Sequence, residues 1–137
     1  MCKGHCIECS ETVSVVLKAA TDKYPLPSNL NANDYPIRAI SVRPQNAAGT
    51  AMDYGKNVLA PDAVLASGFL ELKEKGEKTR LSNLSLDYLA YRDSMFTCSK
   101  WNPLDSNKSN LNLNSAAAGF TAGQVIEITF FYDCPSC

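Results

Sequence analysis

Cysteine pairs with the spacing of zinc ligands stand near both ends of this sequence. The first pair is Cys6 and Cys9, and the second pair is Cys134 and Cys137. Two residues separate the cysteines of each pair, as in structural zinc sites with four thiolate ligands. We therefore expect these four residues to bind one structural Zn²⁺ that joins the two ends of the chain.

Other outcomes stay open at these cysteines. Cys2 and His5 lie beside the first pair, so Cys2 could replace a ligand and His5 could adjoin the site. In an oxidising exterior the pairs would instead form disulfides, within or between the two ends, and free thiols are the remaining alternative. Cys98 stands apart in a candidate strand, where we expect a small buried side chain.

Metal binding is strong enough to hold the two ends together. The segment between the pairs is about 125 residues long, and closing a flexible loop of that length costs roughly 4 kcal/mol. Structural zinc binding contributes on the order of 10–16 kcal/mol in small zinc fingers. The metal term therefore exceeds the loop term, provided that the first and last segments already lie side by side.

Residues suited to catalysis are sparse in the rest of the chain. His5 is the single histidine, which leaves little acid–base chemistry near neutral pH. The sequence contains neither a glycine-rich phosphate loop nor a nucleophile elbow. We therefore expect a protein that is not an enzyme.

Charge and hydropathy exclude two kinds of partner. The formal net charge is -1, from 13 basic and 14 acidic side chains, so we expect no nucleic-acid binding. No run of about 18 apolar residues is present, so we expect no membrane-spanning segment. The first residues lack the apolar stretch of a signal peptide, which favours synthesis in a reducing compartment.

Short apolar segments of strand length fill the chain between the cysteine pairs. Pro36 and Pro44 bracket one such segment, and proline suits strand edges better than a helix interior. Lys75–Lys78 has the composition of a hairpin turn. The candidate strands are Thr12–Lys18, Ile37–Arg43, Val58–Leu65, Ala66–Lys73, Thr79–Leu86, Met95–Trp101, Leu111–Asn114 and Gln124–Tyr132. Their spacing predicts an all-β fold, an antiparallel β-sandwich or barrel formed by one domain, residues 1–137.

Helix signals are weaker than strand signals. Ser85–Tyr91 is long enough for one or two helical turns, and a helix over Thr12–Thr21 is an alternative to the first strand.

The last candidate strand is the strongest, and it can bring Cys134 to the start of the chain. Residues 1–11 and 133–137 are therefore expected to form a cysteine clasp.

One set of strands resembles a known family. Three consecutive segments resemble the strand–hairpin–strand of small jelly-roll virion proteins of bacteriophages, namely Phe69–Lys73, Lys75–Lys78 and Leu81–Leu86. The closing strand Val125–Tyr132 resembles the last strand of such proteins. The resemblance is one of pattern and covers roughly residues 37–133.

The resemblance implies a single jelly roll and a structural role. The protein would be a capsid, vertex or capsid-decorating subunit, made in the host cytoplasm and located in the virion. Its partners would be other copies of itself and other virion proteins, in a homo-oligomer.

A second function remains open on the same fold. A β-sandwich can hold a carbohydrate or peptide on its loops. Two loops are long and polar, Tyr24–Tyr35 and Asn102–Asn110, and the aromatic side chains of Trp101 and Tyr35 lie at or beside them. The alternative prediction is therefore a non-viral binding module.

Overall fold

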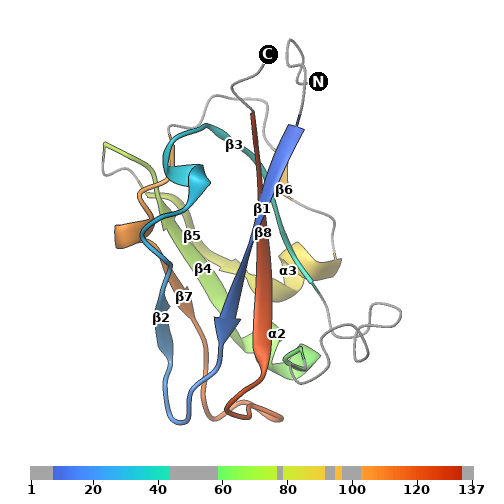
Figure 1. The fold of residues 1–137 in the computed structure, drawn as a ribbon. Helices are drawn as coiled ribbons and strands as arrows, with labels where there is room; N and C mark the ends of the chain where they lie inside the picture. Colours follow the sequence, from blue (N-terminus) through green and yellow to red (C-terminus); the bar gives the residue numbers. More distant parts are fainter. Residues whose placement is uncertain (1–7, 44–58, 77–78, 92–94, 97–102, 134–137) are drawn as a thin grey trace.

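The computed structural model describes residues 8–43, 59–76, 79–91, 95–96 and 103–133. Within these ranges, two four-stranded antiparallel sheets face each other (Figure 1). The first sheet has the order β1-β8-β3-β6, with β1 Glu8–Val16, β8 Val125–Asp133, β3 Ile37–Val42 and β6 Met95–Phe96. The second has the order β2-β7-β4-β5, with β2 Lys23–Pro25, β7 Asn110–Asn112, β4 Phe69–Lys73 and β5 Thr79–Ser85. The prediction of an all-β antiparallel fold is confirmed.

The strands pair as nested hairpins along the chain. β1 pairs with β8, β2 with β7, β3 with β6 and β4 with β5. Two further pairings, β3 with β8 and β4 with β7, join these hairpins into the two sheets. The innermost turn falls where the hairpin Lys75–Lys78 was predicted, and Gly76 supplies a positive φ of 99° there. Residues 77 and 78 lie outside the described residues.

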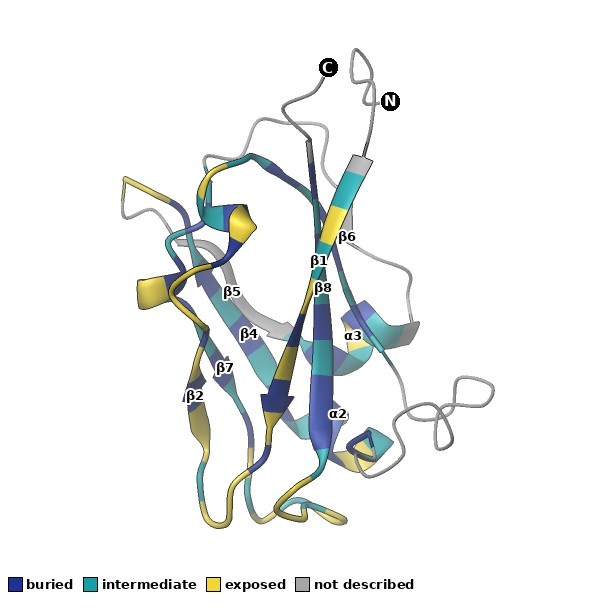
Figure 2. Cartoon of the chain, viewed as in Figure 1, coloured by how far each residue is buried: buried dark blue, intermediate teal, exposed yellow. Residues whose placement is uncertain are grey.

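Apolar side chains from both sheets form one buried core. Figure 2 colours the buried residues of the two sheets dark blue. In β8 the side chains of Ile126, Ile128 and Phe130 are at most 1% exposed, whereas the alternate residues from 127 to 131 are partly exposed. Successive side chains of a strand point to opposite faces, so this alternation buries one face of β8. β4 contributes Leu70 and Leu72 to the same core from the facing sheet.

The predicted strand Val58–Leu65 is wrong over its described part. Leu59 forms an isolated parallel bridge with Val125, and the helix α2 (Asp62–Ser67) starts directly after Pro61. A proline at a helix start removes no intrahelical hydrogen bond, and an aspartate in the first turn suits the positive end of the helix. A short apolar run after such a start signal therefore favours a helix.

Other parts of the sequence prediction also differ from the structure, and β1 begins at Glu8 rather than Thr12. β4 begins at Phe69 rather than Ala66, because α2 takes up the preceding residues. β2 lies in a segment predicted as loop, since three residues ending in a proline carry no alternation that could indicate a strand.

The helical prediction for Ser85–Tyr91 is confirmed by α3 (Leu86–Tyr91). The described residues also contain two 3-10 turns, η1 (Asn31–Asn33) and η2 (Ser106–Lys108). In the described part of the chain, no helix is long and apolar enough to cross a membrane.

Candidate functional site

In the sequence, one cysteine pair stands at the start of β1 and the other directly follows β8. β1 and β8 are antiparallel, with Glu8 opposite Asp133 and Cys9 opposite Tyr132. The residues that precede β1 and those that follow β8 therefore begin side by side. This register meets the geometric condition that a link between the two ends requires.

Cys9 is the one predicted metal ligand within the described residues, and it is disulfide-bonded. A disulfide sulfur offers no thiolate to a metal, so at this residue the structure has the disulfide alternative. Cys6, Cys134 and Cys137 lie outside the described residues, as do Cys2, His5, Cys98 and Trp101. Across the described ranges, no group of three or more His, Cys, Asp or Glu side chains is placed to hold a metal ion.

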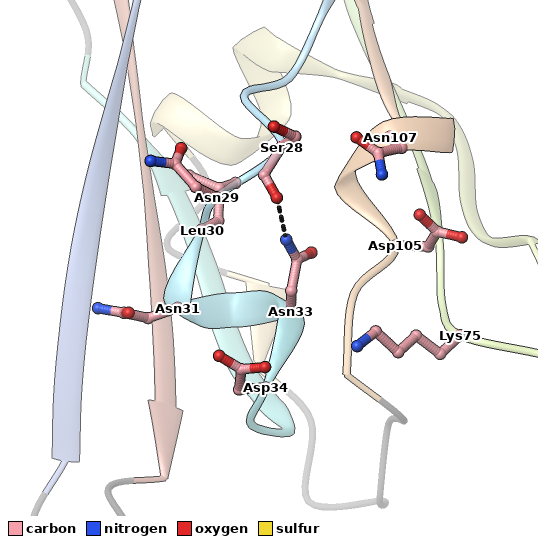
Figure 3. Close-up of a pocket in the computed structure, with 9 residues that line it drawn as sticks. All are labelled: Ser28, Asn29, Leu30, Asn31, Asn33, Asp34, Lys75, Asp105 and Asn107. Carbon is pink, nitrogen blue, oxygen red and sulfur yellow. Dashed lines mark hydrogen bonds between the residues drawn. The ribbon is translucent and has the colours of Figure 1, made fainter.

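A polar pocket lies where the two predicted polar loops meet (Figure 3). Its volume is about 420 Å³. It draws residues from the η1 region, from the η2 region and from the end of the β4 hairpin. The lining residues are Ser28, Asn29, Leu30, Asn31, Asn33, Asp34, Lys75, Asp105 and Asn107.

The side chain of Asn33 ties the two loops together. Its Nδ2 donates to the carbonyl oxygen of Ser28 at 2.8 Å and to the Oγ of Ser106 at 3.0 Å. Its Oδ1 accepts a hydrogen bond from the backbone N–H of Ser106 at 3.1 Å. Every polar atom of this amide is thus engaged in holding the pocket wall, so Asn33 serves as a positioning residue.

Backbone hydrogen bonds fix the same region. The N–H of Leu104 donates to Ala32, and the N–H of Asp105 donates to Lys73, both at 2.8 Å. The N–H of Lys75 donates to the carbonyl oxygen of Pro103, also at 2.8 Å. The loops are therefore joined to each other and to the end of β4, which gives the pocket a preformed shape.

A carboxylate from β1 holds the η1 turn in place. The Oε2 of Glu11 accepts from the N–H of Asn31 at 3.1 Å, and Oε1 accepts from the N–H of Ala32 at 3.3 Å. Backbone N–H groups at the start of a helical turn lack partners within the turn, and a carboxylate supplies them. The first sheet thereby positions one side of the pocket.

Amide and carboxylate groups give the pocket its chemistry. The side chains of Asn29, Asp34, Asp105 and Asn107 can donate to or accept from a hydroxyl-bearing ligand. Tyr35 is not part of the lining: its ring stacks on Tyr132, with centroids 5.6 Å apart and planes 9° from parallel. Tyr35 therefore does not contribute to this pocket, and Trp101 lies outside the described residues.

Sequence reasoning identified the two loops but not the residues that organise them. Glu11 lies just before the first predicted strand, Thr12–Lys18, and Asn33 is one of several asparagines in a polar segment. Neither has a local signal, because each acts on a segment far away in the sequence. Only the loop composition pointed to this region.

Protein-family models, curated proteins and solved structures were all compared with this chain, and none matches it. Function is therefore argued from the geometry of the fold and its sites.

Proposed function

We propose that this chain is a jelly-roll structural subunit of a virus particle, such as a capsid, vertex or capsid-decorating protein of a bacteriophage. The observation that carries the proposal is the nested strand pairing. When a long antiparallel hairpin of eight strands is rolled up, strands 1, 8, 3 and 6 form one sheet and strands 2, 7, 4 and 5 form the other. The two sheets of this chain have these orders. Viral capsid domains are prominent users of that double-sheet architecture.

Strand order by itself is compatible with more than one function, because jelly rolls also occur in lectins and cupins. The sandwich core is filled by apolar side chains from both sheets, which suits a rigid building block. The pattern resemblance to phage virion proteins adds the particle context. Together these support a role in which copies of the subunit contact one another in a shell.

The cysteine clasp would stabilise this subunit. In a reducing host cytoplasm, the thiolates of Cys6, Cys9, Cys134 and Cys137 make up the donor set of a closed zinc site. The register of β1 with β8 supports their approach, since Cys9 lies opposite Tyr132 and the second pair follows shortly after. On release to an oxidising exterior, the same sulfurs would form disulfides, as Cys9 does in the structure.

Immunogold labelling tests the particle role directly. An antibody raised against the purified chain should label phage particles from a culture that carries this sequence. Label on intact particles supports the proposal. Label confined to the cell lysate, with particles purified from the same culture left bare, contradicts it.

The polar pocket supports a second candidate, a sandwich module that binds a saccharide. Its amide and carboxylate groups match the hydroxyl groups of a sugar in hydrogen-bonding capacity. A glycan array followed by NMR titration of the purified chain tests this. Binding that is lost in Asn107→Ala, an exposed lining residue, but kept in the matched Asn114→Ala outside the pocket would favour the second candidate.

A further inference from the structure

In the part of the chain that the structure describes, each sheet has two edge strands, and three of the four carry features that discourage further pairing. β2 is three residues long and contains Lys23 and Pro25. β6 is two residues long, and β5 pairs with β4 through two register shifts. Short strands, lysines, prolines and irregular pairing are the usual protection of exposed edges.

The fourth edge, β1, has none of these features. It is nine residues long, contains neither lysine nor proline, and pairs with β8 without a register shift. A long regular edge strand is a template for another strand, because one row of its backbone N–H and C=O groups points away from the sheet.

Two hydrogen bonds establish which groups form that row. The N–H of Leu17 donates to Gln124 at 2.8 Å, and hydrogen-bonded pairs alternate along an antiparallel ladder. On the other side of β8, the carbonyl oxygen of Glu127 accepts from the N–H of Arg43, the residue after β3, which fits the same alternation. The backbone groups of Ser10, Thr12, Ser14 and Val16 therefore face the open edge.

Among the described residues, this row of backbone groups has hydrogen-bond partners at its end but not along its length. The outward N–H and C=O of Lys18, the next residue in the series, are both bonded to the hydroxyl of Tyr24, at 3.0 and 3.2 Å. Within the described residues, no group is hydrogen-bonded to the outward backbone of the four preceding members of the row, residues 10, 12, 14 and 16. Their side chains are all exposed, and Val16 reaches 49%.

We propose that this edge binds β1 of a second copy of the chain, antiparallel, across a two-fold axis. With Thr12 opposite Ser14 of the second copy, all four outward residues find backbone partners. Glu11 then lies opposite Val15 rather than another Glu11, so the register brings no like charges together. The result is one continuous sheet across two subunits, an interface that is the same on both sides.

A second copy is the occupant that this edge favours. The open row is centred on Val13, and a two-fold axis through Val13 maps the row onto itself. The four outward side chains are small or uncharged, so two copies can approach without repulsion. This contact deepens the proposed assembly role by naming one surface, and particles could still assemble through other surfaces if it failed.

Ser14→Pro tests the contact, with Ser14→Ala as the matched control. Proline removes an N–H that points away from β8, so the β1–β8 ladder stays intact. Alanine keeps the N–H and removes the hydroxyl alone. Sedimentation velocity over a concentration series should show a dimer for the wild type and for Ser14→Ala. The dissociation constant of Ser14→Pro should rise about tenfold or more, because each dimer loses two hydrogen bonds.

A second variant and an amide-exchange measurement test the same contact. If Ser14→Pro fails to fold by circular dichroism, Ser14→Lys replaces it, since lysine keeps the N–H but places like charges near the two-fold axis. Amide exchange at Thr12 and Ser14 should slow as the wild-type concentration rises. A wild type that stays monomeric, or a folded proline or lysine variant that dimerises like Ser14→Ala, overturns the proposal.

Discussion

At the scale of single residues, Glu11 shows how a charge on an inward strand position is accommodated. It alternates with the buried Val13 and Val15, yet its carboxylate meets two backbone N–H groups of the η1 turn rather than the apolar core. The residue thus links the first sheet to the loop that lines the pocket.

Glu11→Ala should lower the free energy of unfolding by about 1–2 kcal/mol, because two backbone N–H groups lose their acceptor and one of them, on Ala32, is fully buried. Glu11→Gln keeps one acceptor oxygen and should cost less. Urea unfolding followed by circular dichroism measures both. Equal losses in the two variants would show that the acceptor role is unimportant.

The carboxyl group of Asp22 should make the stability of the fold depend on pH. Hydrogen bonds from the side chain and from the backbone N–H of Ser115, the latter at 2.8 Å, lower the pKa of the Asp22 carboxyl below its ordinary value. A lowered pKa in the folded state means that the carboxylate stabilises the fold above the unfolded-state value, about 3.9. That contribution is lost as the pH falls through the lowered pKa.

The melting temperature of the wild type should therefore exceed that of Asp22→Asn at neutral pH, and the gap should close in strong acid. Thermal unfolding of both proteins over a pH series measures the gap. A gap that widens on acidification would contradict the assigned sign.

At the scale of elements, sequence patterns were reliable where one face of a strand is buried. β8, β3 and β4 show alternation or β-branched runs, and their assignments required no knowledge of the partners. α2 was misassigned because its apolar residues are too few to distinguish a period of 3.6 from a period of 2. β2 forms through its pairing with β7 and ends at a proline, and the residues of β2 themselves carry no pattern that indicates this pairing.

Gly68 lies where α2 passes into β4, and its neighbours leave no room for a side chain. A Cβ there would approach the Cδ2 of Leu113 to 2.6 Å and the carbonyl oxygen of Asn112 to 3.0 Å. The backbone oxygen cannot rotate away, so the strand itself would have to shift.

Gly68→Ala should therefore destabilise the fold by about 1–3 kcal/mol, measured by urea unfolding. Gly123→Ala is the comparison, because a Cβ there meets no atom within 4 Å and the cost is limited to its φ of 95°. That cost is about 1–2 kcal/mol. If Gly68→Ala lost clearly less free energy of unfolding than Gly123→Ala, the steric explanation would be wrong.

At the scale of the whole molecule, the start of β1 and the end of β8 lie side by side, with Glu8 opposite Asp133. The cysteine spacing alone led to the prediction that the ends are joined, and the register of β1 with β8 is consistent with it. The chemical form of the link could not be predicted, since thiolate and disulfide depend on the redox state rather than on spacing.

Reduction in the presence of a chelator should lower the free energy of unfolding by about 2–4 kcal/mol, because both forms of the link are then removed. When zinc is present during reduction, most of the lost free energy of unfolding should be recovered. The protein should then contain about one equivalent of zinc, measured by elemental analysis. Cys9→Ser should show the loss without any reductant. If zinc gave no recovery and no bound metal, the clasp would be a disulfide alone.

The nested pairing also bears on how the chain reaches its fold. The hydrogen bond between Thr12 and Thr129 joins residues 117 apart in the sequence, whereas β4 and β5 are neighbours through a short turn. Closing a longer loop costs more entropy, so the innermost hairpin is the cheapest nucleus and the outermost ladder the most expensive. Pulsed amide exchange during refolding should protect β4 and β5 before β1. Because the chain then folds from its middle toward its ends, Cys9 reaches its place last, and the proposed link between the ends would lock a fold that is already complete.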